Sequence, residues 1–415
     1  MNTLAAKRPS LDFDLQSLES IGEHLGDHLD AIREADPIFW SDIQKGWFVT
    51  RFQDVVDGFM GKYPLSNVRL DKLAFASIPE SEWASRIPLL TSATPTFTNM
   101  MDPPRHTFVR RTMAPAFTPK TIQAMRPFVQ RRVKELLDWA EEEREFEFIE
   151  GIARPLTGSV IMEMMGVPEE YLGQLREWAF GVVNAIGTPR PSAELLESGE
   201  AAMRAMDDLF TQEIAKRHQS PTSDFLSAMA KATQGEDGLS HAEVLGNCVN
   251  ALLAGHESTA STLAFGTDAF AKYPDQVSYM LSHPDEIQNV LAEIGRYILM
   301  SACMTRVATA DFEWGGKQIK KGDVVYLWMA AGGRDPSVVS NPRAFDVSRP
   351  PVESLVFGRG IHFCIGHMLA KLELGEFFLA AFSRFKIEVL DNPLDYSGSY
   401  SFRTVSTMNV RFTPR

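Results

Sequence analysis

Apolar residues recur along most of the chain with the spacing of amphipathic helices. The longest pattern runs over residues 240–272. It begins with Ser240 and has Glu243 three residues later, which is the capping-box arrangement that marks a helix start. Shorter patterns predict further helices over residues 131–143, 151–166 and 193–217.

Strand patterns are short and scattered. Residues 46–50 predict a strand, and an amphipathic helix over residues 52–60 follows it. Residues 311–319 and 323–328 alternate between apolar and polar positions, and Gly315-Gly316 within the first stretch is a hairpin signature. We therefore expect a mainly α fold with small β-sheets, of the α+β class.

Length and composition indicate one large core. The chain has 415 residues, of which 44% are hydrophobic, so it can bury an extensive interior. No Ser/Gly-rich tract, charge block or fixed-period repeat divides it. We expect residues 1–415 to form a single domain.

Charge and hydropathy limit the partners. The net charge of −13 argues against nucleic acid. The first twenty residues lack the apolar core of a signal peptide, and no apolar run approaches membrane-spanning length. We expect a cytoplasmic protein that does not contact a membrane.

The cysteine count limits the redox chemistry that the chain could perform alone. Cys248, Cys303 and Cys364 are too few for a disulfide framework or for a four-cysteine iron–sulfur cluster. No G-x-G-x-x-G fingerprint for a flavin or nicotinamide is present. If the reaction needs electrons, another protein delivers them.

Residues 357–366, Phe-Gly-Arg-Gly-Ile-His-Phe-Cys-Ile-Gly, hold the strongest chemical signal. Cys364 follows two glycines, Gly358 and Gly360, which permit a tight turn, and it precedes an apolar helical run over residues 365–375. A helix N-terminus stabilises a thiolate. The sulfur is then a nucleophile or a metal ligand, whereas the alternative of a buried structural cysteine leaves the flanking glycines unexplained.

The centre of the longest predicted helix carries unusual residues. Gly255 costs about 1 kcal/mol relative to alanine inside a helix, so either a close flat ligand or a helix–helix contact must favour it. Glu257 is followed by Ser258 and Thr259, whose hydroxyls can bond backbone carbonyls and open the helix locally. Both explanations of Gly255 stay open.

Two further pairs have helical spacing. Asp102-Pro103-Pro104 predicts a helix start with Asp102 as the N-cap, and His106 and Arg110 then share one face. Glu293 and Arg296 form E-x-x-R, which on most helices is a weak surface pair.

The cysteine decapeptide resembles the haem-ligand loop of the cytochrome P-450 superfamily, and the other family motifs follow in the right order over residues 95–375. The resemblance implies a cytochrome P-450 fold with haem b between the long central helix and the cysteine loop with its helix. Cys364 would be the axial thiolate of the haem iron, which favours O–O cleavage. The residues implied to hold the haem or its propionates are His106, Arg110, Ala254, Gly255, Arg306, Phe357, Gly358, His362, Cys364 and Gly366.

The family's acid–alcohol pair delivers protons during activation of O₂, the co-substrate. The resemblance assigns this role to Glu257 with a hydroxyl. Ser258 stands where the family usually has threonine, and Thr259 follows it, so either hydroxyl could act. The Glu293–Arg296 pair would belong to a buried structural network completed by Arg349, with Arg343 as the alternative.

The resemblance also places the substrate pocket. The apolar loop over residues 68–98 would lie over an apolar small molecule. The expected pocket residues are Phe75, Ile78, Leu89, Leu90, Ala251, Leu299, Met300, Ala302, Thr305, Phe402 and Val405.

The expected activity is that of a haem-thiolate monooxygenase, which hydroxylates or epoxidises its substrate. Its electrons would come from an iron–sulfur ferredoxin and an NAD(P)H-dependent reductase, and a basic face of Arg105, Arg111, Arg359 and Lys371 would attract that ferredoxin to a monomeric enzyme. The alternatives are a peroxide-driven peroxygenase, an isomerase, or a haem protein that senses a gas. Glu257 with Ser258 counts against the peroxygenase and the isomerase. A sensor would need an output domain, which the sequence does not indicate, and would give Glu257 no clear purpose.

Overall fold

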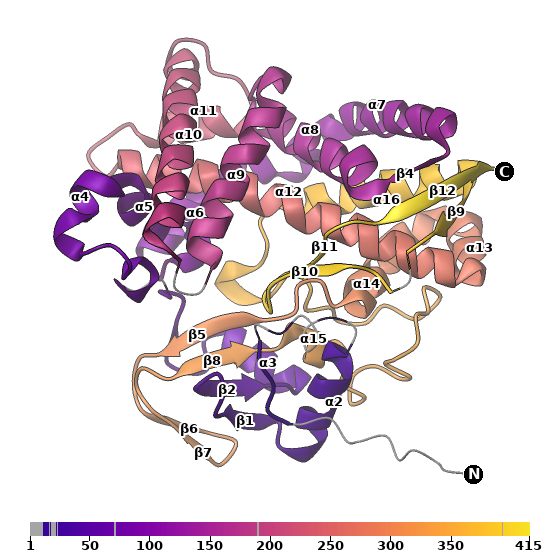
Figure 1. Cartoon of the computed structure of the whole chain (residues 1–415), viewed down its shortest axis with the longest axis horizontal. Helices are drawn as coiled ribbons and strands as arrows, with labels where there is room; N and C mark the ends of the chain where they lie inside the picture. Colours follow the sequence, from indigo (N-terminus) through magenta and orange to yellow (C-terminus); the bar gives the residue numbers. More distant parts are fainter. Residues whose placement is uncertain are drawn as a thin grey trace.

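The computed structural model describes residues 11–15, 17, 22, 24–69, 72–188, 191–391 and 393–415. Figure 1 shows helices packed on both sides of one long helix that crosses the molecule, with a small sheet at the lower end. The predicted class, mainly α with small β-sheets, is confirmed.

The long helix is α12 (His241–Lys272). Both bonds of its capping box form: Ser240 accepts from the Glu243 N–H, and the Glu243 carboxylate accepts from the Ser240 N–H at 2.8 Å. The helices in direct contact with α12 are α5 (Pro88–Ala93), α8 (Arg154–Met165), α9 (Leu172–Gly187), α10 (Ala193–Gln219), α13 (Pro274–Ser282), α14 (Ile287–Ile298) and α16 (His367–Arg384).

The other helices cover these or pack on the sheet. They are α2 (Leu25–Ala35), α3 (Phe52–Phe59), α4 (Trp83–Arg86), α6 (Arg105–Met113), α7 (Pro119–Glu143), α11 (Phe225–Ala232) and α15 (Met329–Gly332). Within the described ranges, no helix is both long and apolar enough to cross a bilayer.

The main sheet has the strand order β1-β2-β8-β5-β3, and only β2 and β8 in it are parallel. Its strands are β1 (Ile38–Ser41), β2 (Gly46–Val49), β3 (Leu65–Ser66), β5 (Met304–Ala308) and β8 (Val324–Leu327). A second sheet joins β4 (Glu145–Glu147), β12 (Asn409–Pro414) and β9 (Phe385–Val389).

Two hairpins complete the β-structure. The strands β6 (Phe312–Trp314) and β7 (Lys317–Ile319) meet at Gly315-Gly316, where both glycines have positive φ, as the sequence predicted. The strands β10 (Tyr396–Gly398) and β11 (Arg403–Val405) form the second pair, and β11 contacts α12.

One expectation about this framework is wrong. Helix α6 begins at Arg105 with Pro104 as N-cap residue, and the Asp102 carboxylate instead accepts from Ser66 Oγ at 2.5 Å and from the Asn67 N–H at 2.9 Å. Leu299 and Ala302, expected in the pocket, belong to the apolar cluster between α2 and the main sheet, together with Leu25.

Candidate functional site

The turn before Cys364 depends on its glycines. Gly358 and Gly360 have φ values of +68° and +69°, in the left-handed region that favours glycine. A Cβ on Gly360 would also lie only 2.6 Å from the Phe59 carbonyl oxygen. The Cys364 N–H donates to the Phe357 carbonyl at 2.9 Å, which closes the loop beneath the sulfur.

Cys364 lies at the start of α16 and is half-buried. Burial raises the pKa of its thiol, and the N–H groups of Gly366 and His367 together with the charge of Arg110 oppose that rise. The two N–H groups that hydrogen-bond the sulfur stabilise its anionic form. The geometry suits a thiolate ligand.

A group of basic side chains converges beside this loop from three separate elements. His106 of α6 and His362 of the cysteine loop have ring centroids 4.1 Å apart. Arg110 Nη2 donates to the Phe363 carbonyl. Arg306 of β5 is buried, and its burial lowers its pKa to about 9, so it still carries its charge at neutral pH. The structure therefore gathers four residues from three segments that lie far apart in the sequence.

Arg69 is a fifth member, which the sequence did not reveal. It follows β3 and is half-buried, and within the described ranges its guanidinium donates to the carbonyls of Thr305 at 3.3 Å and Asn99 at 3.1 Å. Its charge acts on both Arg306 and His362. No sequence pattern marks Arg69, but Asn67, two residues earlier, bonds His362 at 2.8 Å and ties this segment to the cysteine loop.

This basic cluster, defined as Arg69, His106, Arg110, Arg306 and His362, has little compensating charge. Asp102 is the carboxylate that acts on His106 and Arg306. Burial lowers the pKa of His362 to about 3, and the neighbouring cationic groups add to that effect. Burial also lowers the pKa of His106.

Both ring nitrogens of His106 are buried and have no hydrogen-bond partner in the part of the chain that the structure describes. Buried polar atoms are almost always bonded, so these nitrogens point to a missing anionic group. Among the described residues, three arginines face one aspartate, which leaves two positive charges. The cluster fits a group that carries two carboxylates, as the haem propionates do.

The face of α12 turned away from α8 is open at its centre. Ala254 is exposed there, and Ser258, one turn later, is half-buried and donates to the Ala254 carbonyl at 2.6 Å. Thr259 is buried. The expected local opening of the helix does not occur, because α12 stays α-helical throughout.

The opposite face of α12 packs on α8. A Cβ on Gly255 would lie 2.5 Å from Ile161 Cδ1, so helix–helix contact explains this glycine. Glu257, on the flank, accepts from Arg154 Nε at 2.9 Å and Nη2 at 3.2 Å. Its carboxylate is 40% exposed, so it can exchange protons with solvent.

The E-x-x-R pair is deeply buried. Glu293 accepts from Arg296 Nε at 2.6 Å and Nη2 at 2.7 Å, and Arg349 Nε lies 3.4 Å from the same carboxylate. Arg343, the alternative third member, is exposed and pairs with Asp27 and Asp30. Arg349 therefore completes the network.

The remaining expected pocket residues divide into three environments. Thr305 and Leu89 are half-buried, and Phe402 is 39% exposed beside β11. The others are buried in the main core around α12: Phe75, Ile78, Leu90, Ala251, Met300 and Val405.

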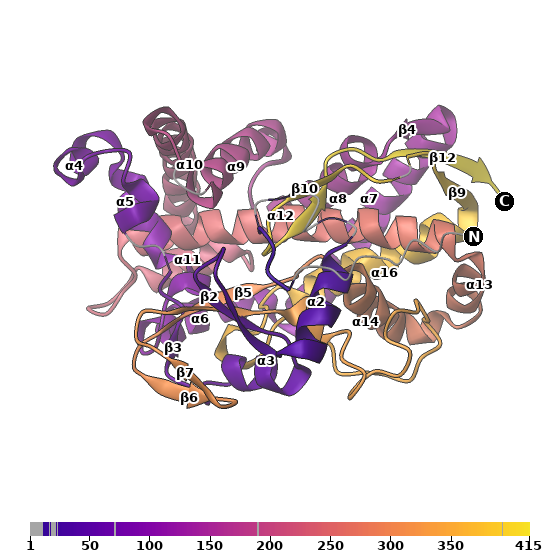
Figure 2. The same ribbon diagram turned by 60° about the horizontal axis from the view of Figure 1, so that its bottom comes forward.

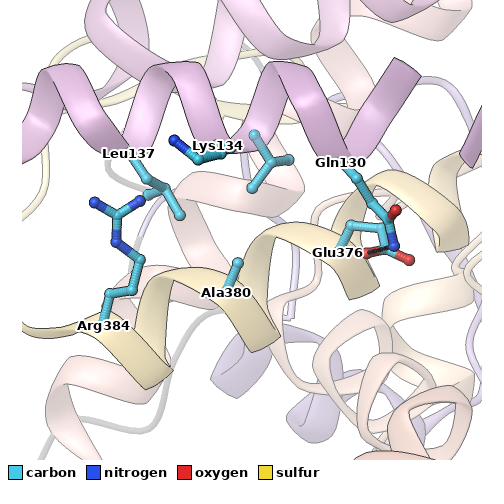
Figure 3. Close-up of a pocket in the computed structure, with 7 residues that line it drawn as sticks. Gln130, Lys134, Leu137, Glu376, Ala380 and Arg384 are labelled. Atoms are coloured by element: carbon cyan, nitrogen blue, oxygen red, sulfur yellow. Dashed lines mark hydrogen bonds between the residues drawn. The ribbon is translucent and has the colours of Figure 1, made fainter. Parts of the chain in front are cut away.

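A groove of 310 Å³ between α7 and α16 lies apart from this site. Figure 3 shows Gln130, Lys134 and Leu137 of α7 facing Glu376, Ala380 and Arg384 of α16. Its charged groups neutralise one another: Gln130 and Arg126 bond Glu376, while Lys134 and Arg384 bond Asp138. Because Glu376 is three turns beyond Cys364, the groove is not the haem site.

Comparisons with known proteins agree with this geometry. The family model described as Cytochrome P450 matches residues 188–402. The biotin biosynthesis cytochrome P450 of Bacillus subtilis (strain 168) is 30% identical over 386 residues, which are 92% of this chain and 95% of that protein. The 6-deoxyerythronolide B hydroxylase of Saccharopolyspora erythraea is 34% identical over 349 residues, 82% of this chain and 83% of that one.

Solved structures give the same result for the fold. The crystal structure of CalO2 has a TM-score of 0.88 with 24% identity and covers 98% of this chain and 100% of its own. The structure of P450BioI in complex with hexadec-9Z-enoic acid ligated acyl carrier protein has a TM-score of 0.84 with 28% identity, covering 95% of this chain and 99% of its own.

Proposed function

This chain belongs to the cytochrome P450 family and is a cytochrome P450 monooxygenase, and we propose that Cys364 binds the iron of haem b and that the enzyme oxidises an apolar small molecule with O₂. The observation that carries the proposal is the cysteine loop: a sulfur at a helix start, bonded by the Gly366 and His367 N–H groups and facing a basic cluster.

The five members of the basic cluster would hold the two haem propionates. His106 would donate from the ring nitrogen that carries its proton, and Arg69, Arg110 and Arg306 would balance the charge. Arg306 and Arg69 would bind the propionates most strongly in this scheme. Burial of an unpaired guanidinium is unfavourable, and a propionate carboxylate would offset that cost.

Haem, when bound, supplies the electron transfer and oxygen activation by which one atom of O₂ enters a C–H bond or an alkene. The open face of α12, with Ala254 and the Ser258 hydroxyl, would contribute to the haem pocket. Glu257, part-exposed on the flank, would take protons from solvent and pass them toward Ser258.

Variants of α12 test this proton path. We expect Glu257→Gln and Ser258→Ala each to slow product formation, by about 10²-fold for Glu257→Gln, while electrons are still consumed. Thr259→Val is the matched control, because Thr259 is buried behind the open face. Product formed per NAD(P)H consumed measures the effect. If Thr259→Val formed less product per NAD(P)H while Ser258→Ala formed the normal amount, Thr259 would be the hydroxyl that delivers protons.

The substrate is proposed to be a lipophilic molecule of modest size. The pocket elements are apolar, and one relative is named a 6-deoxyerythronolide B hydroxylase, while another was solved with an acyl group on its carrier protein. These names support a polyketide-like or fatty-acyl substrate for this chain.

A ferredoxin with an NAD(P)H-dependent reductase is the proposed electron source for a monomeric, cytoplasmic enzyme. The basic face around the cysteine loop is smaller than expected, because Arg105 pairs with Glu243 and Arg359 with Glu353. Lys371 lies over the Phe357 ring at 6.0 Å, and Arg111 is exposed. These two cations remain to attract an acidic partner.

Charge reversal tests this docking face. We expect Arg111→Glu with Lys371→Glu to slow reduction by ferredoxin several-fold at low salt, and the difference to shrink as salt screens the charges. Lys45→Glu, on the exposed β1–β2 turn, is the control. Stopped-flow reduction under CO measures the rate. Equal rates for the double variant and wild type would remove this face as the docking site.

The spectrum of the ferrous–CO complex tests the proposed haem ligation directly. A strongly red-shifted Soret band is expected for a thiolate ligand. A band typical of histidine ligation, or a protein without haem, would overturn it. Turnover with ferredoxin and NAD(P)H, compared with turnover with peroxide alone, separates the monooxygenase from the peroxygenase and isomerase alternatives.

A further inference from the structure

We propose that Glu200 of α10 is a positioning residue that holds helix α5 as a wall of the substrate pocket. The existence of that pocket rests on the proposed function. The contact itself stands on the geometry of α5 and α10, which come from distant parts of the chain and lie on the same side of α12 (Figure 2).

The Glu200 carboxylate is buried and fully engaged. Its Oε2 accepts from the backbone N–H groups of Leu89 at 3.0 Å and Leu90 at 2.9 Å. Arg204 Nη2, one turn later on α10, lies 2.9 Å from Oε1. The side chain is 3% exposed, so the carboxylate depends on these donors in place of water.

Helix α5 needs this carboxylate because it has no cap of its own. Ile87, its N-cap residue, has no side-chain acceptor, and Pro88 at the first position has no N–H. Leu89 and Leu90 carry the free N–H groups that a cap normally satisfies. A six-residue helix is too short to be stable alone, and Glu200 supplies the cap from 110 residues along the chain.

Other contacts place α5 within one body with α9 and α10. Arg86 at the end of α4 pairs with Glu197 of α10 at 2.8 Å. A Cβ on Gly199 would meet Ala185 of α9 at 2.4 Å and Leu90 Cδ1 at 3.4 Å. Helices α9 and α5 therefore both pack closely on α10 at Gly199, one residue before Glu200.

The far end of α5 rests on the long helix. A Cβ on Gly246 of α12 would lie 2.5 Å from the Ala93 carbonyl oxygen. Gly246 is two turns, about 12 Å, before Ala254 on the open face. Helix α5 thus spans from α10 to α12 and meets α12 about 12 Å from Ala254. Glu200 fixes the positions of Leu89 and Leu90 in it.

Loss of this cap is expected to loosen α5 without touching the haem ligands. Glu200→Ala removes the acceptor, and Glu200→Gln keeps its size but not its charge. We expect amide hydrogen exchange of residues 88–93 to accelerate at least about tenfold in Glu200→Ala and less in Glu200→Gln. Glu194→Gln, the same change at an exposed position of α10, should leave exchange there as in wild type.

Binding of apolar compounds provides the second readout. Spin-state titrations of the haem-loaded proteins with a panel of lipophilic compounds are expected to show several-fold weaker binding in Glu200→Ala, with an unchanged ferrous–CO band. Unchanged exchange in residues 88–93 would overturn the role of Glu200. Faster exchange with unchanged affinity for every compound would overturn the placement of α5 as a pocket wall.

Hydrogen exchange in α5 tests the role of Glu200 independently of the proposed function. If wild type bound no haem, the function would fail, yet exchange in α5 would still decide whether Glu200 holds that helix.

Discussion

Replacing Cys364 with serine is expected to abolish the red-shifted ferrous–CO band and the monooxygenase activity together. The sulfur accepts two backbone N–H groups at the start of α16, a setting that stabilises an anion. A serine hydroxyl in the same place stays protonated at neutral pH. It cannot donate electron density to iron as a thiolate does.

The matched control is Cys248→Ala. Cys248 is buried in α12 among apolar residues, and burial raises the pKa of its thiol, so it stays a neutral thiol. Its removal should leave the CO band in place. Haem content and the position of the band are measured on both variants at equal protein concentration. A Cys364→Ser protein that kept the band would show that another group ligates the iron.

The basic cluster illustrates what local spacing can and cannot predict. His106 and Arg110 follow from i, i+4 geometry, but their meeting with Arg306 and His362 depends on how α6, β5 and the cysteine loop pack. Only the family resemblance linked them in advance. Arg69 carried no motif, because β3 is two residues long and offers almost no pattern.

The errors in the predicted elements have physical causes of the same kind. Asp102 has the chemistry of an N-cap, but Ser66 and Asn67 are nearer donors in the folded chain. Helix α7 starts at Pro119, twelve residues before the predicted start, and it contains Pro127. Pro127 is exposed, so water can bond the carbonyl that the proline leaves unpaired.

The apolar environment of an expected pocket residue also depends on tertiary geometry. Leu299 ends α14 with a φ of +53°, which turns the chain and places its side chain in the cluster between α2 and the main sheet. An apolar residue before a strand cannot reveal which of two apolar environments it enters. Gly255 shows the same limit, since only the contact with Ile161 decided between its two explanations.

The second large effect is expected at Glu293, where substitution should remove a sizeable part of the protein's stability. Glu293 is the anion for two arginines whose side chains are 1% and 6% exposed. It also accepts from the Asp346 N–H at 2.9 Å, which ties α14 to the loop before the cysteine. Glu293→Gln leaves two buried guanidinium groups without a counter-charge, at a cost of about 3–5 kcal/mol.

A loss of that size is a large fraction of the roughly 5–15 kcal/mol that stabilises a folded protein. The measurement is the urea denaturation midpoint of the haem-loaded protein, followed by circular dichroism. Glu135→Gln makes the same change in an exposed ion pair with Arg132 and should cost less than about 0.5 kcal/mol.

Substitutions at the three network members should differ in how much stability they remove. Arg349→Met removes the contact at 3.4 Å and the Arg349 hydrogen bonds to the carbonyls of Ser340, Asn341 and Ala344. It leaves the two short Arg296 bonds to Glu293 intact, so we expect a smaller loss than in Glu293→Gln. A Glu293→Gln midpoint equal to that of Glu135→Gln would mean that backbone carbonyls, such as that of Pro342 at 2.6 Å from Arg296 Nη1, suffice to hold the arginines. In that case the network would position the cysteine loop without stabilising the fold.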